Sequence, residues 1–385
     1  MIVRTALAAL LLAAPAAHAA GYDGTREGFR QFVAEHGEAW PVPATIATFT
    51  ASDGKKIRYA HWAAEGHAPP AGTVVFFQGR TEFIEKNVDT YADLAARGYD
   101  VWTLDWRGQG LSDRLLPDPD KGHVDSYDSY LRDADQFLAD IVRLDQSPRP
   151  RILLAHSMGG GIGTLYLERH PGRFDKAVFT SPLVRLPARQ DSWLLRLAAR
   201  ALVAAGRGTD CAPTADCSWT SSFKAGFDPC AEPQAATEAD LLDPNNTSRY
   251  THDPARLAEI ECWVEASREA PQGGKTLAIA GATTGWLEAT YAATDEITAH
   301  QGALTTPLLI VGAAGENASA CAVVSNPGQR QLCTEGDRPC CRVEIPGAGH
   351  EILVETDAIR RRFFDYFDAF VRTDLGPRAF CARYG

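Results

Sequence analysis

Short apolar runs bounded by turn residues recur along the first half of the chain. The four strongest runs are residues 73–77, 101–106, 151–156 and 176–180. In the segments between them, such as 91–97 and 130–144, apolar residues recur with the spacing of an α-helix. Continuous apolar strands that alternate with helices are typical of a parallel sheet covered on both faces. An earlier pair of runs, 46–50 and 56–60, surrounds a Ser-Asp-Gly turn and predicts an antiparallel hairpin at the sheet edge.

This pattern is interrupted after residue 182. Residues 183–300 contain no buried-strand run and are helical, loop-rich and dotted with tryptophans, before strand-like runs resume at 307–311 and 341–345. An amphipathic helix follows, with Phe363, Phe367 and Phe370 on one face. We therefore predict an α/β fold with a mostly parallel central sheet flanked by helices. Its core spans 21–182 and 301–385, and a helical cap inserted at 183–300 covers the C-terminal ends of the strands, where such folds place their sites.

The first residues follow a different pattern. Arg4 precedes an apolar run over 6–14, and Ala17-His-Ala19 fits a cleavage site between small residues. The run is shorter than the roughly 20 residues that span a bilayer, which favours a cleaved signal peptide over an anchor. We predict a signal peptide at residues 1–20 and an exported protein, periplasmic or secreted. The alternative is an N-terminal helix retained in the membrane.

Composition narrows the class of protein. The 385 residues are 45% hydrophobic and 23% charged, values of a globular protein that exclude disordered and fibrous chains. The net charge is −11 and no basic block occurs, which argues against nucleic acid as a partner.

The nine cysteines all lie between residues 211 and 381. In an oxidising compartment some should pair. Cys211 is expected to pair with Cys217, and further pairs are expected within the group Cys321, Cys333, Cys340, Cys341 and Cys381. Because nine is odd, one thiol stays free, and we predict Cys262. Paired C-x-x-C spacing and nearby histidines are lacking, so no metal site is expected.

The strongest local signal for chemistry is Leu-Ala-His-Ser-Met-Gly-Gly at 154–160, between a predicted strand and a helix that begins near Met158. A serine on such a turn is held in a strained backbone with its hydroxyl above the sheet. Ala155, where glycine is usual, and Gly159 are small enough for strand and helix to approach closely. We predict Ser157 as a nucleophile, the alternative being an ordinary serine at a helix N-terminus.

A nucleophilic serine needs a base, and the base needs an acid that orients it. In this type of fold the acid precedes the histidine along the chain. His350, on the turn after the last predicted strand, is the predicted base. Glu316 follows the strand that ends near residue 311 and is the predicted acid, with Glu335 and Asp337 as competitors. His156, next to the serine, is expected to face away from it and support the turn.

Backbone N–H groups should stabilise the negative oxygen that forms during acyl transfer. Met158 offers one, and Arg80, in the loop after the strand 73–77, offers the second. Gly79 permits the tight turn of that loop, and Gly79 and Trp286 are candidates for substrate contact. The guanidinium of Arg80 is a candidate partner for a phosphate or carboxylate, or for a surface salt bridge.

Several motifs together resemble the monoacylglycerol lipase and lysophospholipase group of α/β-hydrolases. They are Asp-Trp-Arg-Gly-Gln-Gly-Leu-Ser at 105–112, Gly-His-Val at 122–124 followed by Tyr130, the serine turn at 155–160 and Gly-His-Glu at 349–351. Segments 78–80, 107–124 and 281–286 most resemble the bacterial lysophospholipase branch. The resemblance covers roughly residues 44–372 and implies an α/β-hydrolase fold, ester hydrolysis and no cofactor.

Residue by residue, the resemblance places the nucleophile at Ser157, the acid at Glu316, the base at His350 and the oxyanion donors at Arg80 and Met158. Three features depart from the group: the acid is more often aspartate, cysteines occur in the cap and near the C-terminus, and the chain begins with an apparent export signal.

The expected activity is hydrolysis of carboxylic esters of single-chain lipids, lysophospholipid or monoacylglycerol, by a Ser-His-Glu triad through an acyl-enzyme, with transient contact with a membrane surface. The cap's tryptophans and Leu194, Leu195 and Leu197 either line an acyl tunnel or pack within the cap. One alternative is a serine aminopeptidase with an acidic pocket formed by Asp191, Glu265 or Glu288. The other is a non-catalytic binding protein that kept the fold.

Overall fold

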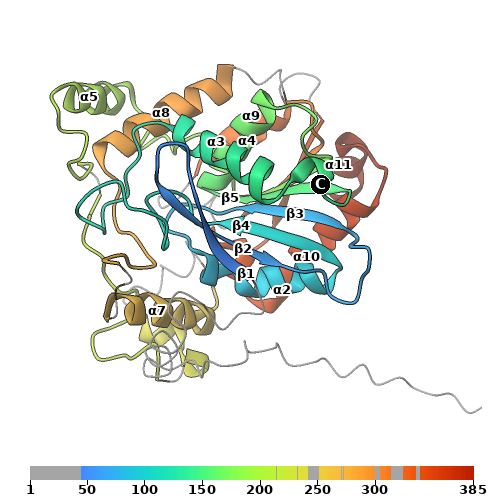
Figure 1. The fold of residues 1–385 in the computed structure, drawn as a ribbon, viewed down its shortest axis with the longest axis horizontal. Helices are drawn as coiled ribbons and strands as arrows, with labels where there is room; N and C mark the ends of the chain where they lie inside the picture. The colour runs from blue at the N-terminus through green and yellow to red at the C-terminus, as the bar shows by residue number, and fades with distance from the viewer. Residues whose placement is uncertain are drawn as a thin grey trace, which may run out of the picture.

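The computed structural model describes residues 45–213, 215–231, 233–241, 251–269, 271, 273–299, 304–313, 324–334 and 339–385. These residues form an eight-stranded sheet in the order β1-β2-β4-β3-β5-β6-β7-β8 (Figure 1). The strands are β1 (Thr45–Thr50), β2 (Lys56–Trp62), β3 (Gly72–Phe77), β4 (Tyr99–Leu104), β5 (Arg151–His156), β6 (Lys176–Thr180), β7 (Leu308–Ala313) and β8 (Cys340–Ile345). β1 pairs antiparallel with β2 at the edge of the sheet. The six strands β3 to β8 run parallel to one another. The predicted sheet and its edge hairpin are confirmed.

The predicted limits of the strands are matched most closely in the centre of the sheet. β5 and β6 coincide with the apolar runs, whereas β4 begins and ends two residues before its run. The strand ends earlier than its apolar run because Trp106, although fully buried, lies outside the strand and donates its indole N–H to the carbonyl oxygen of Gln78 at 2.8 Å. A buried turn continues the apolar run and hides the end of the strand.

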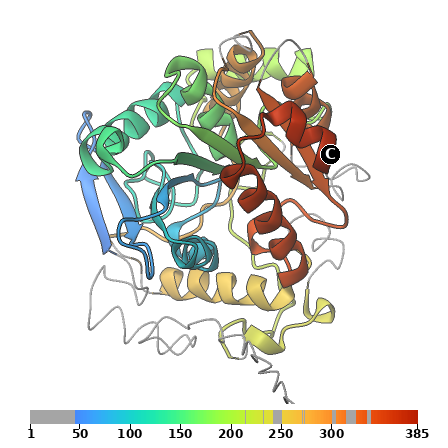
Figure 2. The ribbon, with the colours of Figure 1, turned by 90° about the vertical axis from the view of Figure 1, so that its right-hand side faces the viewer.

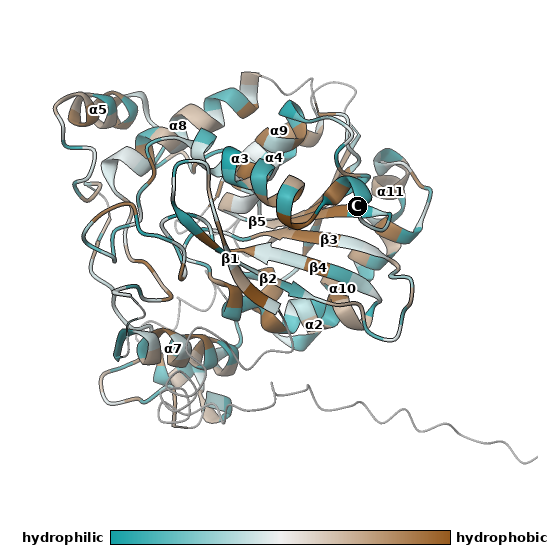
Figure 3. Cartoon of the chain, in the orientation of Figure 1, coloured by the Kyte–Doolittle hydropathy of each residue, from teal (hydrophilic) through white to brown (hydrophobic). Residues whose placement is uncertain are grey.

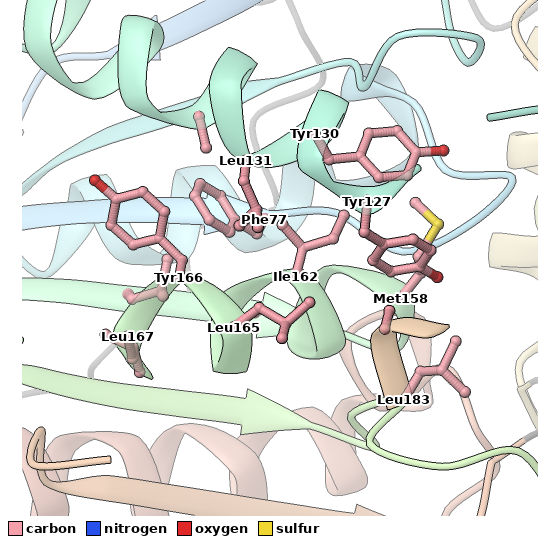
Figure 4. Packing of buried hydrophobic residues seen from close by; sticks show 14 of the residues in the cluster. Phe77, Tyr127, Tyr130, Leu131, Met158, Ile162, Leu165, Tyr166, Leu167 and Leu183 are labelled. Atoms are coloured by element: carbon pink, nitrogen blue, oxygen red, sulfur yellow. The ribbon is translucent and has the colours of Figure 1, made fainter. Parts of the chain in front are cut away.

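Helices cover both faces of the sheet. One face is covered by α3 (Tyr127–Gln136), α4 (Met158–Arg169) and α8 (Thr284–Ala299), and the other by α2 (Val88–Ala96), α10 (Asp357–Arg372) and α11 (Pro377–Tyr384) (Figure 2). Alternate residues of β3 serve the two cores: Phe77 packs with Leu131 of α3 and Ile162 of α4 (Figure 4), whereas Phe76 packs on the α2 side. This two-sided burial explains the continuous apolar runs.

The segment between β6 and β7 adds α5 (Trp193–Ala204) and α7 (Pro254–Glu269) as well as α8, and no strand among its described residues joins the sheet. In Figure 1, α5 lies at the periphery, away from the sheet. Leucine and alanine predominate in α5 and are interrupted by Arg196 and Arg200, and Figure 3 shows hydrophobic and hydrophilic residues on this helix. Among the residues described, no helix combines the length and apolar character needed to cross a membrane. The predicted signal peptide at 1–20 lies outside the described residues.

Four disulfides link the described cysteines: Cys211–Cys217, Cys230–Cys262, Cys333–Cys340 and Cys341–Cys381. The predicted Cys211–Cys217 pair and the pairing within the late group are confirmed. The prediction that Cys262 is free is wrong, because α7 presents it at a Cα–Cα distance of 4.7 Å to Cys230. No sequence spacing marks that pair, since its members are 32 residues apart. Cys321, the ninth cysteine, lies outside the described residues.

The two late disulfides secure the edge strand β8. Cys340 and Cys341 are neighbours and point to opposite faces, so one bonds to Cys333 of α9 (Asn326–Thr334) and the other to Cys381 of α11. A strand at a sheet edge has an unpaired side, and anchoring it to two helices holds it in register. The loop after this strand carries His350.

Candidate active site

Ser157 occupies a strained turn between β5 and α4. Its φ of 49° and ψ of −117° lie outside the regions that residues with a side chain normally adopt, at a cost of about 1–3 kcal/mol. Its surroundings fix this conformation: its N–H donates to the carbonyl of Thr180 at 3.1 Å, and its own carbonyl accepts from Leu183 at 2.7 Å. Its hydroxyl caps no helix N–H, which argues against the alternative that Ser157 is an ordinary capping serine at the N-terminus of a helix.

Gly159 allows this turn to sit tightly against the neighbouring strand. A Cβ at Gly159 would lie 2.0 Å from the carbonyl oxygen of Phe77 and 2.4 Å from that of Gln78. Helix α4 therefore approaches the end of β3 closely enough to place Ser157 beside the loop that follows β3.

The structure brings His350 to Ser157. The two residues are 193 positions apart in sequence, and the Nε2 of His350 lies 2.9 Å from the Oγ of Ser157. Both side chains are buried, with Ser157 8% and His350 2% exposed. At this distance the hydroxyl can donate to the imidazole, the contact that a general base needs. The acid predicted at Glu316 and its competitors Glu335 and Asp337 lie outside the described residues.

The loop after β3 borders the serine. A Cβ at Gly79 would lie 3.2 Å from the Cβ of Ser157, so only a residue without a side chain fits there undisturbed. Arg80 and Met158 line the same cavity as Ser157. Met158 is the first residue of α4, and a first-turn N–H has no acceptor within its helix. Both predicted oxyanion donors thus lie around the serine.

Gln109, which sequence reasoning did not single out, clamps this loop. Its side-chain oxygen accepts from the N–H of Thr81 at 3.2 Å, and its side-chain nitrogen donates to the carbonyl of Gly79 at 3.0 Å. Trp106 holds the preceding residue, Gln78, in the same way. The motif at 105–112 therefore supports the loop. The motif itself was the available signal, although spacing alone does not reveal which loop it holds.

A cavity of about 670 Å³ opens at the serine, within the range of small-molecule sites. Predicted contacts Leu195, Trp219 and Trp286 line it. Leu194 and Leu197 do not: they are 58% and 57% exposed, because the inward face of α5 is formed by residues three and four apart. That face consists of Leu195, Ala198, Ala199 and Leu202.

The other two tryptophans of the segment do not line the cavity. Trp193 is 72% exposed, and Trp263 packs in the core on the α2 side of the sheet. The acidic residues among the described lining are Asp216 and Glu351, not Asp191, Glu265 or Glu288. Asp191 instead forms ion pairs with Arg185 at 2.8 Å and Arg196 at 2.6 Å.

Arg80 presents its guanidinium in the cavity wall. The guanidinium carbon lies 5.1 Å from the ring centroid of Trp286, and Nη2 donates to the carbonyl of Ala280 at 2.6 Å. Gly122 leaves room for it, since a Cβ there would lie 2.4 Å from Nη2. An aromatic face and a carbonyl oxygen both stabilise a cation at this position.

His156 takes the supporting place expected for it. Its Nδ1 lies 3.0 Å from the hydroxyl of Thr180, and its Nε2 lies 3.3 Å from a carboxylate oxygen of Glu351. Burial alone would lower the pKa of His156, but the carboxylates of Glu82 and Glu351 outweigh it and raise this pKa. The two carboxylates therefore favour the protonated form of His156, which lies beside the Ser157 turn.

Comparisons with known proteins identify the family of this chain. The profile of the serine aminopeptidase S33 family matches residues 68–357. Lysophospholipase L2 of Escherichia coli is 32% identical over 324 residues, which cover 82% of this chain and 83% of that protein. Monoacylglycerol lipase of Mycolicibacterium smegmatis is 32% identical over 143 residues, 36% of this chain and 46% of that protein.

Solved structures give the same fold. A soluble variant of monoglyceride lipase from Saccharomyces cerevisiae, crystallised with a substrate analogue, superposes with a TM-score of 0.59 at 17% identity, over 85% of this chain and 94% of that one. The likeness at this identity concerns the fold alone. Sequence and structure together establish that the chain has the α/β-hydrolase fold and belongs to the serine aminopeptidase S33 family.

Proposed function

We propose that this protein is a serine hydrolase that cleaves carboxylic esters of single-chain lipids, of the lysophospholipid or monoacylglycerol type. The observation that carries the proposal is the 2.9 Å contact between Ser157 and His350 in the wall of a cavity of about 670 Å³ that is otherwise largely apolar. Relatives are named for lysophospholipid and monoacylglycerol hydrolysis, which supports the same substrate class.

In the proposed reaction, the Oγ of Ser157 attacks the acyl carbonyl carbon while Nε2 of His350 takes the hydroxyl proton. The carbonyl oxygen becomes negative and accepts hydrogen bonds from the N–H groups of Arg80 and Met158. The intermediate then collapses, and His350 returns its proton to the departing alcohol. Water, deprotonated by His350, attacks the carbonyl carbon of the acyl-enzyme; the bond to Oγ then breaks, His350 returns the proton to Oγ, and the fatty acid is released. Glu316 is the proposed acid that orients the imidazole.

The cavity suggests how the two ends of the lipid bind. The acyl chain fits the wall formed by Leu195, Leu202 and Trp286. The guanidinium of Arg80, held against Trp286, suits the phosphate of a lysophospholipid, because a guanidinium binds phosphate oxygens in pairs. Residues 183–300 would then act as a cap that encloses the chain above Ser157.

The outer face of α5 suits contact with a lipid surface. Trp193, Leu194 and Leu197 are exposed there, while the opposite face of the same helix lines the cavity. We infer transient contact of α5 with a membrane surface during substrate uptake. Export to the periplasm or medium, proposed from residues 1–20, is compatible with four disulfides, which persist in oxidising compartments.

The test is fatty-acid release from lysophosphatidylcholine, monoolein and p-nitrophenyl esters, with aminoacyl amides measured in parallel. Ser157→Ala should lower turnover at least about 10⁴-fold and leave the thermal midpoint unchanged. Ser218→Ala, an exposed serine of the same cavity, is the matched control. Cleavage of amides alone would indicate a serine aminopeptidase and contradict the proposed lipid substrate. The absence of any turnover that depends on Ser157 would indicate a non-catalytic binding protein.

A second variant tests the head group. Arg80→Met keeps the backbone N–H and removes the guanidinium, so KM for lysophosphatidylcholine should rise about tenfold while KM for monoolein stays the same. An equal change for both lipids would show that Arg80 acts on the loop and not on the phosphate.

A further inference from the structure

A buried cluster of charged groups lies beside the Ser157–His350 pair. It consists of Glu82, Lys86, His156 and Glu351, whose side chains are 1%, 10%, 2% and 11% exposed. The Nζ of Lys86 lies 2.9 Å from one carboxylate oxygen of Glu351 and 3.5 Å from one of Glu82. The other oxygen of Glu351 lies 3.3 Å from Nε2 of His156. Removing such groups from water is costly, so stability alone is a weak reason to keep them.

The cluster draws its members from three segments of the active site, because Glu82 and Lys86 are four residues apart in the segment after β3. Glu82 accepts a hydrogen bond from the N–H of Gly79, in the loop after β3. His156 directly precedes Ser157, and Glu351 directly follows His350. The rings of His156 and His350 lie 4.9 Å apart. The cluster is therefore the point at which the loop after β3, the turn after β5 and the loop after β8 are joined.

Lys86 occupies the centre of this junction. A ring nitrogen of His156 and one carboxylate oxygen each of Glu82 and Glu351 lie within 4.8 Å of one another, a spacing that suits a bound cation. The ammonium of Lys86 contacts both carboxylates. Burial alone would lower the pKa of Lys86, but the two carboxylates outweigh it and raise this pKa. For Glu351, Lys86 and His156 overcome the effect of burial and hold the pKa well below its ordinary value.

We propose that Lys86 is a positioning residue: its ammonium is an internal cation that holds Glu82 and Glu351 together and thereby fixes the oxyanion loop and the His350 loop around Ser157. Without it, two carboxylates would face each other in a buried site and separate. Their separation would pull Gly79 and His350 apart. The inference rests on the proposed ester hydrolysis, because it concerns the rate of that reaction, and it assigns Lys86 no contact with substrate.

The expected signature is a loss of kcat at nearly constant KM. Lys86→Met should lower kcat for p-nitrophenyl acetate about 10- to 100-fold, since a displacement of about 1 Å at a reacting group costs up to about 10²-fold. KM should change less than about twofold, because the apolar wall on α5 and α8 is not part of the cluster. Lys86→Arg, which keeps the charge, should retain most of the rate.

Chemical rescue separates charge from packing. In Lys86→Ala, added methylammonium should restore part of kcat, and an uncharged, non-nucleophilic analogue of similar size, ethane dissolved in the buffer, should not. A small cleft of about 20 Å³ is lined by Lys86, Asn87 and Leu353, and truncation of Lys86 would enlarge it to make room for the amine. Lys176→Met is the matched control: its ammonium binds the carbonyls of Phe370, Val371 and Thr373, so its loss should lower the thermal midpoint and leave kcat unchanged.

Unchanged kcat in Lys86→Met would overturn the proposal, and so would equal impairment of Lys86→Arg and Lys86→Met in folded protein. If Lys86→Met does not fold, Glu82→Gln provides the second test, with a lower kcat expected and an unchanged kcat contradicting the inference. Failure of the proposed function is distinguishable, because the unmodified protein would then show no turnover that depends on Ser157.

Discussion

Two helices of equal length border the cavity, and they are built in opposite ways. α4 and α5 each contain 12 residues; 11 residues of α4 are buried, whereas Ala199 alone is buried in α5. α4 begins Met-Gly-Gly-Gly-Ile-Gly, a poor helix former, because each glycine costs about 1 kcal/mol relative to alanine. α5 is rich in leucine, alanine and arginine, which favour a helix by themselves.

The contrast follows from what each helix does. α4 holds Ser157 in a strained conformation, so its start must fit the sheet without side chains in between, and tertiary packing offsets its low propensity. α5 has to form with few contacts at the edge of the molecule, and a sequence with high propensity allows that. A rigid base for chemistry and a loosely packed wall for substrate thus place different demands on composition.

The largest effect should come from the buried charges beside the start of α4. The pKa of Glu351 is held well below its ordinary value of 4.5, so its contribution to stability is present above about pH 4.5 and is lost as the pH falls below that value. Glu351→Gln should therefore lower the free energy of unfolding by about 3–5 kcal/mol at pH 7, and the difference from the unmodified protein should shrink between pH 5 and pH 3.

Urea unfolding at pH 7, 5, 4 and 3 measures this difference. Glu65→Gln, at an exposed site, is the control and should change nothing at any pH. A difference that stays constant down to pH 3 would show that Glu351 stabilises the protein through packing and not through its charge.

The segment between β6 and β7, which contains α5 and α7, should depend instead on covalent links. Cys230 and Cys262 close a loop of 32 residues, and the double variant Cys230→Ser/Cys262→Ser should lose roughly 3–4 kcal/mol of stability. Denaturant unfolding gives the value. A peptide that joins the two cysteines in a non-reduced digest ties the loss to the bond, whereas two free thiols there would contradict the pairing.

Much of the α4 side could be predicted from sequence, because its constraints are periodic and local. Fully buried strands gave continuous apolar runs, so β5 and β6 were placed to the residue. The serine turn was recognisable because small residues must follow a strand there. His350 could be paired with Ser157 because the order of strands in a parallel sheet brings both to the same edge.

The rest depended on contacts that leave no periodic trace. Lys86 and Glu351 meet across 265 positions of sequence, and neither position differs in pattern from a solvated charge. The partner of Cys262 was hidden for the same reason. The sequence left open which leucines of α5 face inward, because Leu194, Leu195 and Leu197 look alike in sequence. The packing of the helix decides that, of these three, Leu195 faces the cavity and the other two are exposed.

A methyl group tests the close fit of α4. Gly159→Ala would place a Cβ 2.0 Å from the carbonyl of Phe77, so helix and strand must move apart. We expect a loss of about 1–3 kcal/mol in stability together with reduced kcat. Gly208→Ala, just beyond α5, is the matched control, since its added Cβ would lie 3.7 Å from Val203 in ordinary contact. Equal effects of the two variants would remove the contrast between the helices.

The smallest effect on stability, and the most selective effect on function, is expected on the outer face of α5. Trp193→Ser/Leu197→Ser changes exposed side chains, so the thermal midpoint should shift by less than the equivalent of about 0.5 kcal/mol. Turnover of lysophosphatidylcholine in vesicles should fall a few-fold, because the apolar contact with the lipid surface is weakened, while p-nitrophenyl acetate in solution is cleaved as before. Leu195→Ser changes a residue of the cavity wall, two positions from both Trp193 and Leu197. This variant should have impaired hydrolysis of long-chain esters whether or not vesicles are present. If the outer-face variant instead slowed both assays equally, α5 would act only as a wall of the cavity, and the division of its two faces between substrate and membrane would be wrong.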